Sequence, residues 1–191
     1  MWNFIRRRWY LILAALVLLL AIPTAILFTR SMRMVREHAA TRTLEPAVIY
    51  DRNGELIERL GQQGEIVRLE EVPEHLKEAV VAVEDARFYR HRGVDVVGVL
   101  RAFWANLRSG RKAQGASTIT MQLARNIFLY PDKTWSRKTQ EAFLAVALES
   151  QYSKDEILEM YLNQTYFGEG AYGVAAAARI YFNKPLSELD L

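Results

Sequence analysis

Glu84 is the first residue whose type and position could do chemistry. It lies in a segment with helical spacing, at the edge of an apolar stripe. That stripe is formed by Leu76, Ala79, Val80 and Val83. A carboxylate half-buried against apolar groups has its charged form disfavoured, so the pKa of Glu84 should be raised toward a value useful for proton transfer. Asp85 falls opposite the stripe, where a carboxylate is normally solvated. The alternative for Glu84 is a structural glutamate paired with Arg87 or Arg90.

A second group follows the small residues Gly115 and Ala116. Ser117 is a good N-cap, so a helix is predicted to begin there with free backbone N–H groups. Such a helix end attracts anions, phosphates among them. One stripe of this helix is polar and another apolar: Thr118, Gln122 and Arg125 against Ile119, Leu123 and Ile127. The polar stripe could line a binding site, or it could be the ordinary solvent-facing side of a capped helix.

A third group opens a later, strongly apolar helix. One line along it, at positions i, i+4, i+7 and i+11, contains Arg137, Glu141, Leu144 and Leu148. Charged residues therefore occupy the first turns of a stripe that is otherwise core, and a buried charge must be paired or serve a purpose. Arg137 and Glu141 could simply pair along the helix. The adjacent Lys138 adds a second cation that could face a phosphate.

A fourth block carries signals that favour structural roles. Ser153 and Glu156 match a capping box at the start of a helix. The glycine-rich loop Gly168–Gly173 precedes the small residues of Val174–Ala178, which favours close packing of helices over catalysis.

A mainly helical framework is predicted to position these residues. After Pro73 almost all of the chain has helical spacing. Helices are predicted near 74–88, 94–108, 117–128, 135–152, 154–163 and 171–182. Upstream, Ala47–Tyr50 and Glu55–Leu60 flank the turn signal Asp51-Arg52-Asn53-Gly54, which predicts a β-hairpin or a short extended arm. The predicted fold class is therefore mainly α with a small extended arm.

The helix near 94–108 carries more large apolar residues than one core face requires. They are Val96, Val97, Val99, Leu100, Phe103, Trp104 and Leu107. Either this helix dips partly into lipid, or it packs in the core.

The N-terminal segment predicts a membrane anchor. Trp9–Phe28 contains no charge and is about long enough to cross a bilayer at roughly 1.5 Å per residue. Arginines flank it on both sides: Arg6, Arg7, Arg8, Arg30, Arg33 and Arg36. The basic, very short N-terminus is expected in the cytoplasm and the rest outside, although the later arginines weaken this asymmetry. A cleaved signal peptide is the alternative, and both interpretations export the domain.

The length of 191 residues suits one globular domain plus an appendage. The predicted plan is a cytoplasmic tail over 1–9, an anchor over 10–28, a stalk over 29–44 and a globular domain over 45–191. Ser187–Asp190 looks like a capping box that opens another helix, so the domain is expected to continue beyond Leu191.

The net charge of +3 clusters around the apolar run, a membrane pattern rather than a nucleic-acid pattern. The absence of cysteine excludes disulfides and thiolate metal sites.

Together these blocks resemble the bacterial peptidoglycan glycosyltransferases, which are the transglycosylase domains of bifunctional penicillin-binding proteins and of monofunctional transglycosylases. The resemblance covers residues from about Ala47 to the end. Its markers are Glu84–Gly93, Gly115–Gln122, Arg137–Glu141 and Tyr161–Asn163. Their order behind an N-terminal anchor makes the resemblance specific.

The resemblance implies an α-helical, lysozyme-like fold, lipid II as substrate, and a role for each site residue. Glu84 would deprotonate the 4-hydroxyl of the acceptor sugar, whose oxygen attacks C1 of the growing chain with inversion and expels undecaprenyl pyrophosphate. Glu141 would be the second essential glutamate. The cations that bind the pyrophosphate would be Arg125, Arg137 and Lys138, and the residues that line the cleft would be Ser117, Thr118 and Gln122. The sequence departs from the family at Met121, where many members carry glutamine, and Arg125 stands where several carry lysine.

No cofactor is expected to be required, a divalent cation stays open, and no protein metal site is predicted. The expected partners are lipid II, the growing undecaprenyl-linked glycan strand, the membrane and other cell-wall synthesis proteins, with no nucleic acid. The expected location is the bacterial inner membrane, with a single pass and the domain on the extracytoplasmic face.

Two other functions compete: a lysozyme-like glycan hydrolase, which would not need the cations, and a non-catalytic membrane-anchored scaffold of wall synthesis.

Overall fold

The computed structural model describes residues 2–40, 47–53, 55–60, 66–110, 115–129 and 135–190. Within these ranges the α-helices are α1 (Trp2–Ala40), α2 (Glu74–Glu84), α3 (Val96–Ser109), α4 (Ile119–Phe128), α5 (Trp135–Glu149), α6 (Lys154–Gln164) and α7 (Gly173–Phe182). The strands are β1 (Ala47–Tyr50) and β2 (Leu56–Leu60), and short 3-10 turns are η1 (Leu69–Glu71), η2 (Phe88–Arg90) and η3 (Leu186–Glu188). The predicted mainly α class with a small β arm is confirmed.

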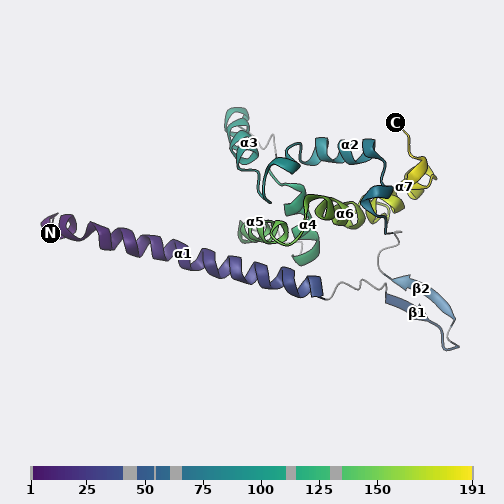
Figure 1. The fold of residues 1–191 in the computed structure, drawn as a ribbon, viewed down its shortest axis with the longest axis horizontal. Helices are drawn as coiled ribbons and strands as arrows, with labels where there is room; N and C mark the ends of the chain where they lie inside the picture. The colour runs from purple at the N-terminus through teal and green to yellow at the C-terminus, as the bar shows by residue number, and fades with distance from the viewer. Residues whose placement is uncertain are drawn as a thin grey trace.

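Helix α1 extends away from the helical body as a long rod (Figure 1). Its stretch Arg8–Glu37 is long and apolar enough to cross a membrane, and none of its most apolar window is buried. The hydroxyls of Thr24 and Thr29 donate to the carbonyls of Leu20 and Ala25, each at 2.9 Å, so both polar groups are satisfied within the helix.

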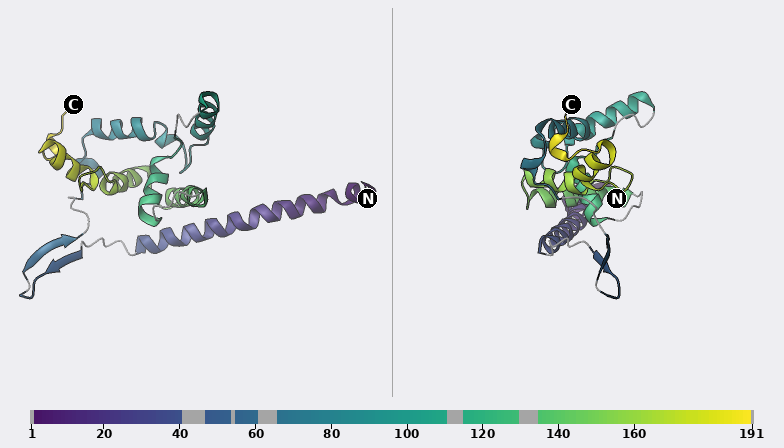
Figure 2. Two further views of the ribbon diagram at one scale, coloured as in Figure 1. Left: turned by 180° about the vertical axis from the view of Figure 1, so that it is seen from behind. Right: turned by 90° about the vertical axis from the view of Figure 1, so that its right-hand side faces the viewer.

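The C-terminal turns of α1 pack on α5, where Ser31 and Val35 become buried. Both views of Figure 2 show this end of α1 beside the helical body. The segment predicted as a stalk over 29–44 is therefore a continuation of the helix as far as Ala40, and residues 41–46 lie outside the described ranges.

The strands β1 and β2 form an antiparallel hairpin with a bulge between Ile49 and Tyr50. Asp51 fixes the turn because its carboxylate accepts hydrogen bonds from the backbone N–H groups of Asn53 and Glu55. The predicted hairpin is confirmed, and it lies apart from the helical body in Figures 1 and 2.

Helix α4 lies at the centre of the core, packed against α5 and α6. Its predicted apolar stripe is confirmed, since Ile119 and Leu123 are fully buried and Ile127 is partly buried against the core. The predicted capping box at the start of α6 is also confirmed, with Ser153 and Glu156 bonded reciprocally. A Cβ on Gly173, which has φ +81°, would lie 2.8 Å from the carbonyl oxygen of Asn163, so glycine permits the close approach of α6 and α7.

Helix α2 ends earlier and turns a different face inward than the sequence predicted. It stops at Glu84 rather than near residue 88, and its core-facing residues are Leu76, Val80 and Val81. Val83, predicted on the apolar stripe, is 81% exposed, and Ala79 is also exposed. The inward stripe is thus shifted toward Val81, and the helical spacing no longer applies from Asp85 onward because the helix has ended.

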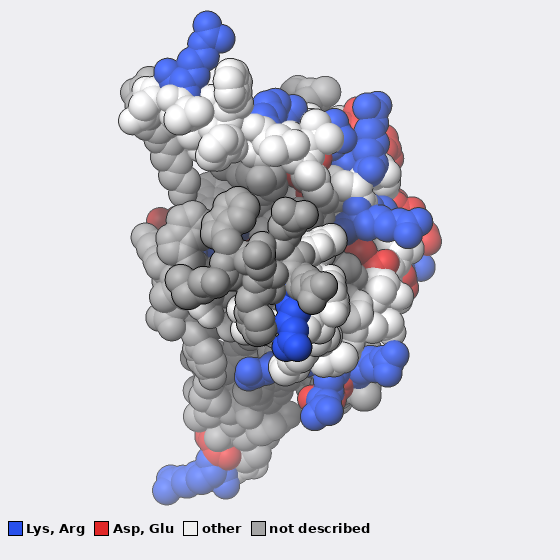
Figure 3. All heavy atoms as spheres, turned by 90° about the vertical axis from the view of Figure 1, so that its left-hand side faces the viewer, with Lys and Arg blue, Asp and Glu red and all other residues white. Residues whose placement is uncertain are grey.

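The apolar residues of α3 do not pack in a core. Each of the seven large apolar side chains named for this helix is at least 40% exposed, while Gly98 and Ala102 face the body. Figure 3 views the molecule from the side toward which α1 extends, and uncharged side chains cover the top of this face, where α3 lies, with Lys and Arg side chains around them. The core-packing alternative is therefore wrong.

The segment near the C-terminus also differs from its prediction. Ser187 does not cap a helix; instead η3 spans Leu186–Glu188 with Pro185 before it and extended backbone at Leu189. Leu186 is buried, so this turn is held by its apolar contact with the core rather than by a capping box.

Candidate active-site cleft

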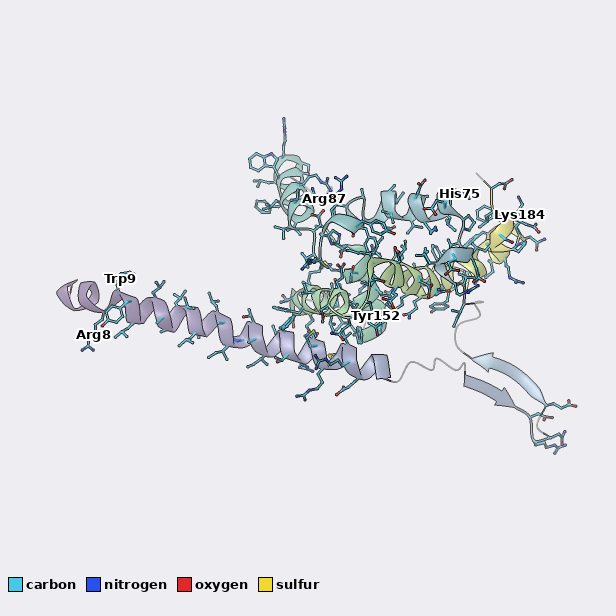
Figure 4. All side chains as sticks on the ribbon, viewed as in Figure 1. Arg8, Trp9, His75, Arg87, Tyr152 and Lys184 are labelled. Atoms are coloured by element: carbon cyan, nitrogen blue, oxygen red, sulfur yellow. The ribbon has the colours of Figure 1, made fainter. Side chains whose placement is uncertain are left out.

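A polar cleft of about 510 Å³ opens where the end of α2, the start of α3 and the segment before α4 meet. Its lining includes Glu84 from α2, Arg101 from α3, and Ser117 from the segment before α4. Arg87 also lines it, and Figure 4 shows this residue near the meeting point of α2 and α3. Side chains from three separate parts of the sequence thus face one space.

Glu84 lies at the end of α2 and is exposed, so the half-burial predicted for it is wrong. Its carboxylate accepts a hydrogen bond of 2.8 Å from Nε2 of Gln122 on α4. Oε1 of the same amide accepts a hydrogen bond of 3.4 Å from the hydroxyl of Tyr161 on α6. The Tyr161 hydroxyl donates to the oxygen of the Gln122 amide, which fixes the orientation of the amide. Its nitrogen is thereby directed at the Glu84 carboxylate. Glu84 does not take up the alternative pairing with Arg87, which contacts Asp95 at 3.3 Å.

Asp85 is buried rather than solvated, with 8% of its surface exposed. Its backbone leaves the helical conformation, at φ −158° and ψ 73°, so its side chain does not follow the predicted helical spacing. The carboxylate oxygens lie 3.1 and 2.9 Å from Nε2 of His91, and one also accepts a hydrogen bond of 3.2 Å from the N–H of Ile119. The N-terminus of α4, which was expected to attract anions such as phosphate, thus has one of its N–H groups bonded to a carboxylate of the chain itself.

The N-cap of α4 is Thr118, one residue after the predicted Ser117. The hydroxyl of Thr118 accepts from the N–H of Met121 at 3.1 Å and donates to the carbonyl of Gly93 at 2.6 Å. Both bonds are buried, so the Thr118 hydroxyl is used within the protein although the residue borders the cleft. This frees the Ser117 hydroxyl for a different partner.

A buried carboxylate and two cations lie behind Ser117. Glu141 is 0% exposed, and its carboxylate lies 2.6 Å from Nζ of Lys138 and 3.2 Å from Nε of Arg137. Nζ of Lys138 also donates to Oγ of Ser117 at 2.7 Å, which links the buried ion pairs to the wall of the cleft. An ammonium group has three N–H donors, and these bonds use two of them. Among the residues that the structure describes, one donor of Lys138 is therefore left for a ligand.

The charge around Tyr161 shows that Glu84 and Arg125 lie in the same neighbourhood. Burial raises the pKa of the Tyr161 hydroxyl, the negative charge of Glu84 raises it further, and the positive charge of Arg125 opposes both. Arg125 itself is half-buried on α4. A phenol that keeps its proton remains the donor that the Gln122 amide needs.

All eight predicted site residues thus lie in one region, in two connected groups. Glu84 and Gln122 are bonded to each other, with Arg125 near them through Tyr161. The other group comprises Ser117, Lys138, Arg137 and Glu141. The two groups meet at the cleft, which is lined by Glu84, Ser117 and Thr118. In the described part of the chain, no cluster of three or more His, Asp or Glu side chains is suited to hold a metal ion.

Sequence reasoning assigned no site role to Asp85, His91 or Tyr161. Two of them already lay in the marker segment Glu84–Gly93, and an aspartate six residues before a histidine was the available signal. That signal could not be interpreted from spacing, because the pair forms only after the helix ends and the chain turns through η2.

The sequence pattern of the family described as Transglycosylase matches residues 53–191. The chain is 52% identical to penicillin-binding protein 1A of Escherichia coli (strain K12), over 76% of this chain and 17% of the relative. It is 51% identical to penicillin-binding protein 1F of Bacillus subtilis, over 75% and 20%. It is 46% identical to penicillin-binding protein 1A of Haemophilus influenzae, over 94% and 21%. The chain therefore spans about a fifth of the length of the curated relatives it matches.

Proposed function

This chain belongs to the transglycosylase family, and from that premise we propose that it is a peptidoglycan glycosyltransferase that polymerises lipid II. The 4-hydroxyl of an acceptor sugar attacks C1 of the growing glycan strand with inversion. The bond between C1 and the diphosphate oxygen breaks, and undecaprenyl pyrophosphate leaves. The cleft between α2, α3 and the start of α4 is where the two sugars meet.

Glu84 acts as the base in this reaction. Its carboxylate is exposed in the cleft and held by Gln122, so it can meet a substrate hydroxyl without first breaking a buried contact. It takes the proton of the attacking hydroxyl as the new bond to C1 forms. The negative charge that develops is on the leaving diphosphate.

Lys138 and Arg125 stabilise that charge, and Arg137, which lines a separate cavity between α1, α4 and α5 rather than the cleft, adds positive charge through its pairing with Glu141. Lys138 reaches the cleft wall through Ser117, and the buried Glu141 holds Lys138 and Arg137 in place from behind. Cations fixed before the reaction stabilise a developing charge without reorganising during it. Glu141 is therefore a positioning residue, and the chemistry is proposed to need no cofactor.

The membrane supplies both partners in this proposal. Lipid II and the undecaprenyl-linked strand are both embedded in lipid, and α1 holds the domain at the same surface. The exposed apolar face of α3 contacts the bilayer beside it. We place the domain on the extracytoplasmic face of the bacterial inner membrane, where other cell-wall synthesis proteins would be its protein partners.

The observation that carries the proposal is the shared cleft of Glu84 and Ser117, with Lys138 bonded to Ser117. The test supplies purified full chain in lipid nanodiscs with lipid II and separates the products by gel electrophoresis. Long glycan strands are expected, and they should be absent with Glu84→Gln. Shorter fragments from preformed strands would identify a glycan hydrolase, and no turnover with retained binding would identify a scaffold. Either of these outcomes would overturn the proposal.

A further inference from the structure

A second cavity, of about 430 Å³, lies where α1, the end of α4 and the start of α5 meet. Among the described residues it shares no lining residue with the polar cleft. Its walls come partly from the long N-terminal helix and partly from the domain, so it exists only because α1 packs on α5.

The lining of this cavity is partly polar and charged and partly apolar. Arg30 and Arg137 bring two guanidinium groups to it, and Ser31 brings a hydroxyl from a residue that is only 6% exposed. Among the described residues, neither the Ser31 hydroxyl nor Arg30 has a hydrogen-bond or ion-pair partner. The remaining wall is largely apolar, including Leu27, Phe128 and Leu144. A small free anion would contact only the polar part of this lining and would leave the apolar wall uncovered.

The position of the cavity along α1 explains this division. The charge-free run ends at Phe28, so Leu27 belongs to the apolar segment and Arg30 is among the first residues beyond it. In a bilayer, the hydrocarbon ends and the phosphate groups begin at this level. The apolar wall is therefore at the depth of acyl chains, and the two guanidinium groups are at the depth of lipid phosphates.

We propose that this cavity binds one anionic phospholipid of the surrounding bilayer. Its phosphate lies between Arg30 and Arg137 with a hydrogen bond from the Ser31 hydroxyl, and an acyl chain lies against Leu27 and Phe128. The two guanidinium groups favour a lipid with net negative charge over a zwitterionic one. The Nε atom of Arg137 also lies 3.2 Å from Glu141, so the bound headgroup touches the same cation as the buried carboxylate behind the cleft.

The experiment measures lipid retention rather than glycan synthesis, so it is independent of the proposed function. The full chain is placed in nanodiscs of phosphatidylcholine and phosphatidylglycerol in equal parts, and bound lipids are counted by native mass spectrometry. We expect one phosphatidylglycerol to remain bound in preference to phosphatidylcholine. Arg30→Gln should reduce that retention by about fivefold or more. The matched control Arg33→Gln removes the same charge from an exposed position on the same helix outside the cavity and should retain the lipid.

Two further arms separate the possible sources of the effect. Ser31→Leu fills the cavity without changing charge and should also lose the lipid, while circular dichroism checks that the variant stays helical. Soluble glycerol phosphate at millimolar concentration should not displace the lipid, because it cannot use the apolar wall. Equal losses in Arg30→Gln and Arg33→Gln, equal retention of both lipid classes, or full displacement by glycerol phosphate would each overturn the proposal.

Discussion

The side-chain amide of Gln122 donates a hydrogen bond of 2.8 Å to the carboxylate of Glu84, joining residues 38 positions apart in the chain. Gln122 belongs to α4, which is fixed in the core by Ile119 and Leu123, whereas Glu84 ends a helix whose outer side is exposed. An exposed carboxylate is thus oriented by a helix that is anchored in the core.

Replacing Glu84 with Gln should lower the rate of lipid II polymerisation by at least about 10²-fold, the smaller end of what a positioned base contributes. The amide keeps the shape of the side chain, so binding of a non-reacting lipid II analogue should persist. Rates are measured by release of undecaprenyl pyrophosphate. Glu78→Gln, on the exposed side of the same helix, is the control and should keep the normal rate. Near-normal turnover in Glu84→Gln would refute its role as the base.

Lys138→Ala should reduce kcat/KM by roughly 10²-fold, because it removes one preorganised cation from the leaving diphosphate. Lys138 also donates to the fully buried Glu141, so the melting temperature should fall, and rates are compared at a temperature well below it. Lys138→Arg keeps the charge and should recover part of the rate. If kcat and KM are unchanged in Lys138→Ala, this residue does not belong to the site.

Asp85→Ala should destabilise the domain much more than a surface substitution. It leaves the His91 ring and the N–H of Ile119 without their buried partner, at a cost of about 1–3 kcal/mol for each group. Asp85→Asn keeps an acceptor for the N–H group and should cost less. Chemical denaturation of the three proteins measures the difference in free energy of unfolding, and equal stabilities would contradict the structural role assigned to the pair.

Tyr161→Phe should change how stability depends on alkaline pH. Burial and the charge of Glu84 raise the pKa of this hydroxyl above its ordinary value of 10.0. A group with a raised pKa in the folded state contributes stability that is complete below the unfolded pKa and is lost as pH rises through the folded pKa. The free energy of unfolding should therefore fall less steeply above about pH 10 in Tyr161→Phe than in the parent. Parallel curves for the two proteins would be the contrary result.

A chelator should change the polymerisation rate by less than about twofold, because Arg125, Arg137 and Lys138 supply fixed positive charge for the diphosphate. The assay compares rates with and without EDTA in buffer free of added metal. A large loss that Mg²⁺ restores would show that a divalent cation takes part.

Much of the fold follows from local patterns in the sequence. Helix α6 was predictable because Ser153 and Glu156 mark its start and apolar residues repeat along it, and these signals act within one or two turns. The burial of Glu141 was likewise visible, since it lies on the line of Leu144 and Leu148. In each case the deciding contacts are close in sequence or follow the helical period.

The predictions were wrong where contacts with residues far away in the sequence determine the local structure. No glycine or proline ends α2 after Glu84; the helix stops where the Asp85 carboxylate meets His91 and the N–H of Ile119. Ser117 and Thr118 are both capping residues, and the choice between them depends on Gly93 and Lys138. The inward face of α3 is formed by Gly98 and Ala102, and the apolar pattern alone could not show that the larger residues point outward.

The continuity of α1 past the apolar run ties the direction of the domain to a count of residues. Each residue inserted between Phe28 and Ser31 would rotate everything beyond it by about 100° and advance it by about 1.5 Å, since an α-helix has a fixed pitch. Two extra residues would rotate the opening of the cleft by about 200° around the axis of α1, so that it faced roughly the opposite way. Seven extra residues would nearly restore its direction and would move the domain about 10 Å further along the axis. The length of α1 therefore sets both the distance of the domain from the membrane and the direction in which its cleft faces.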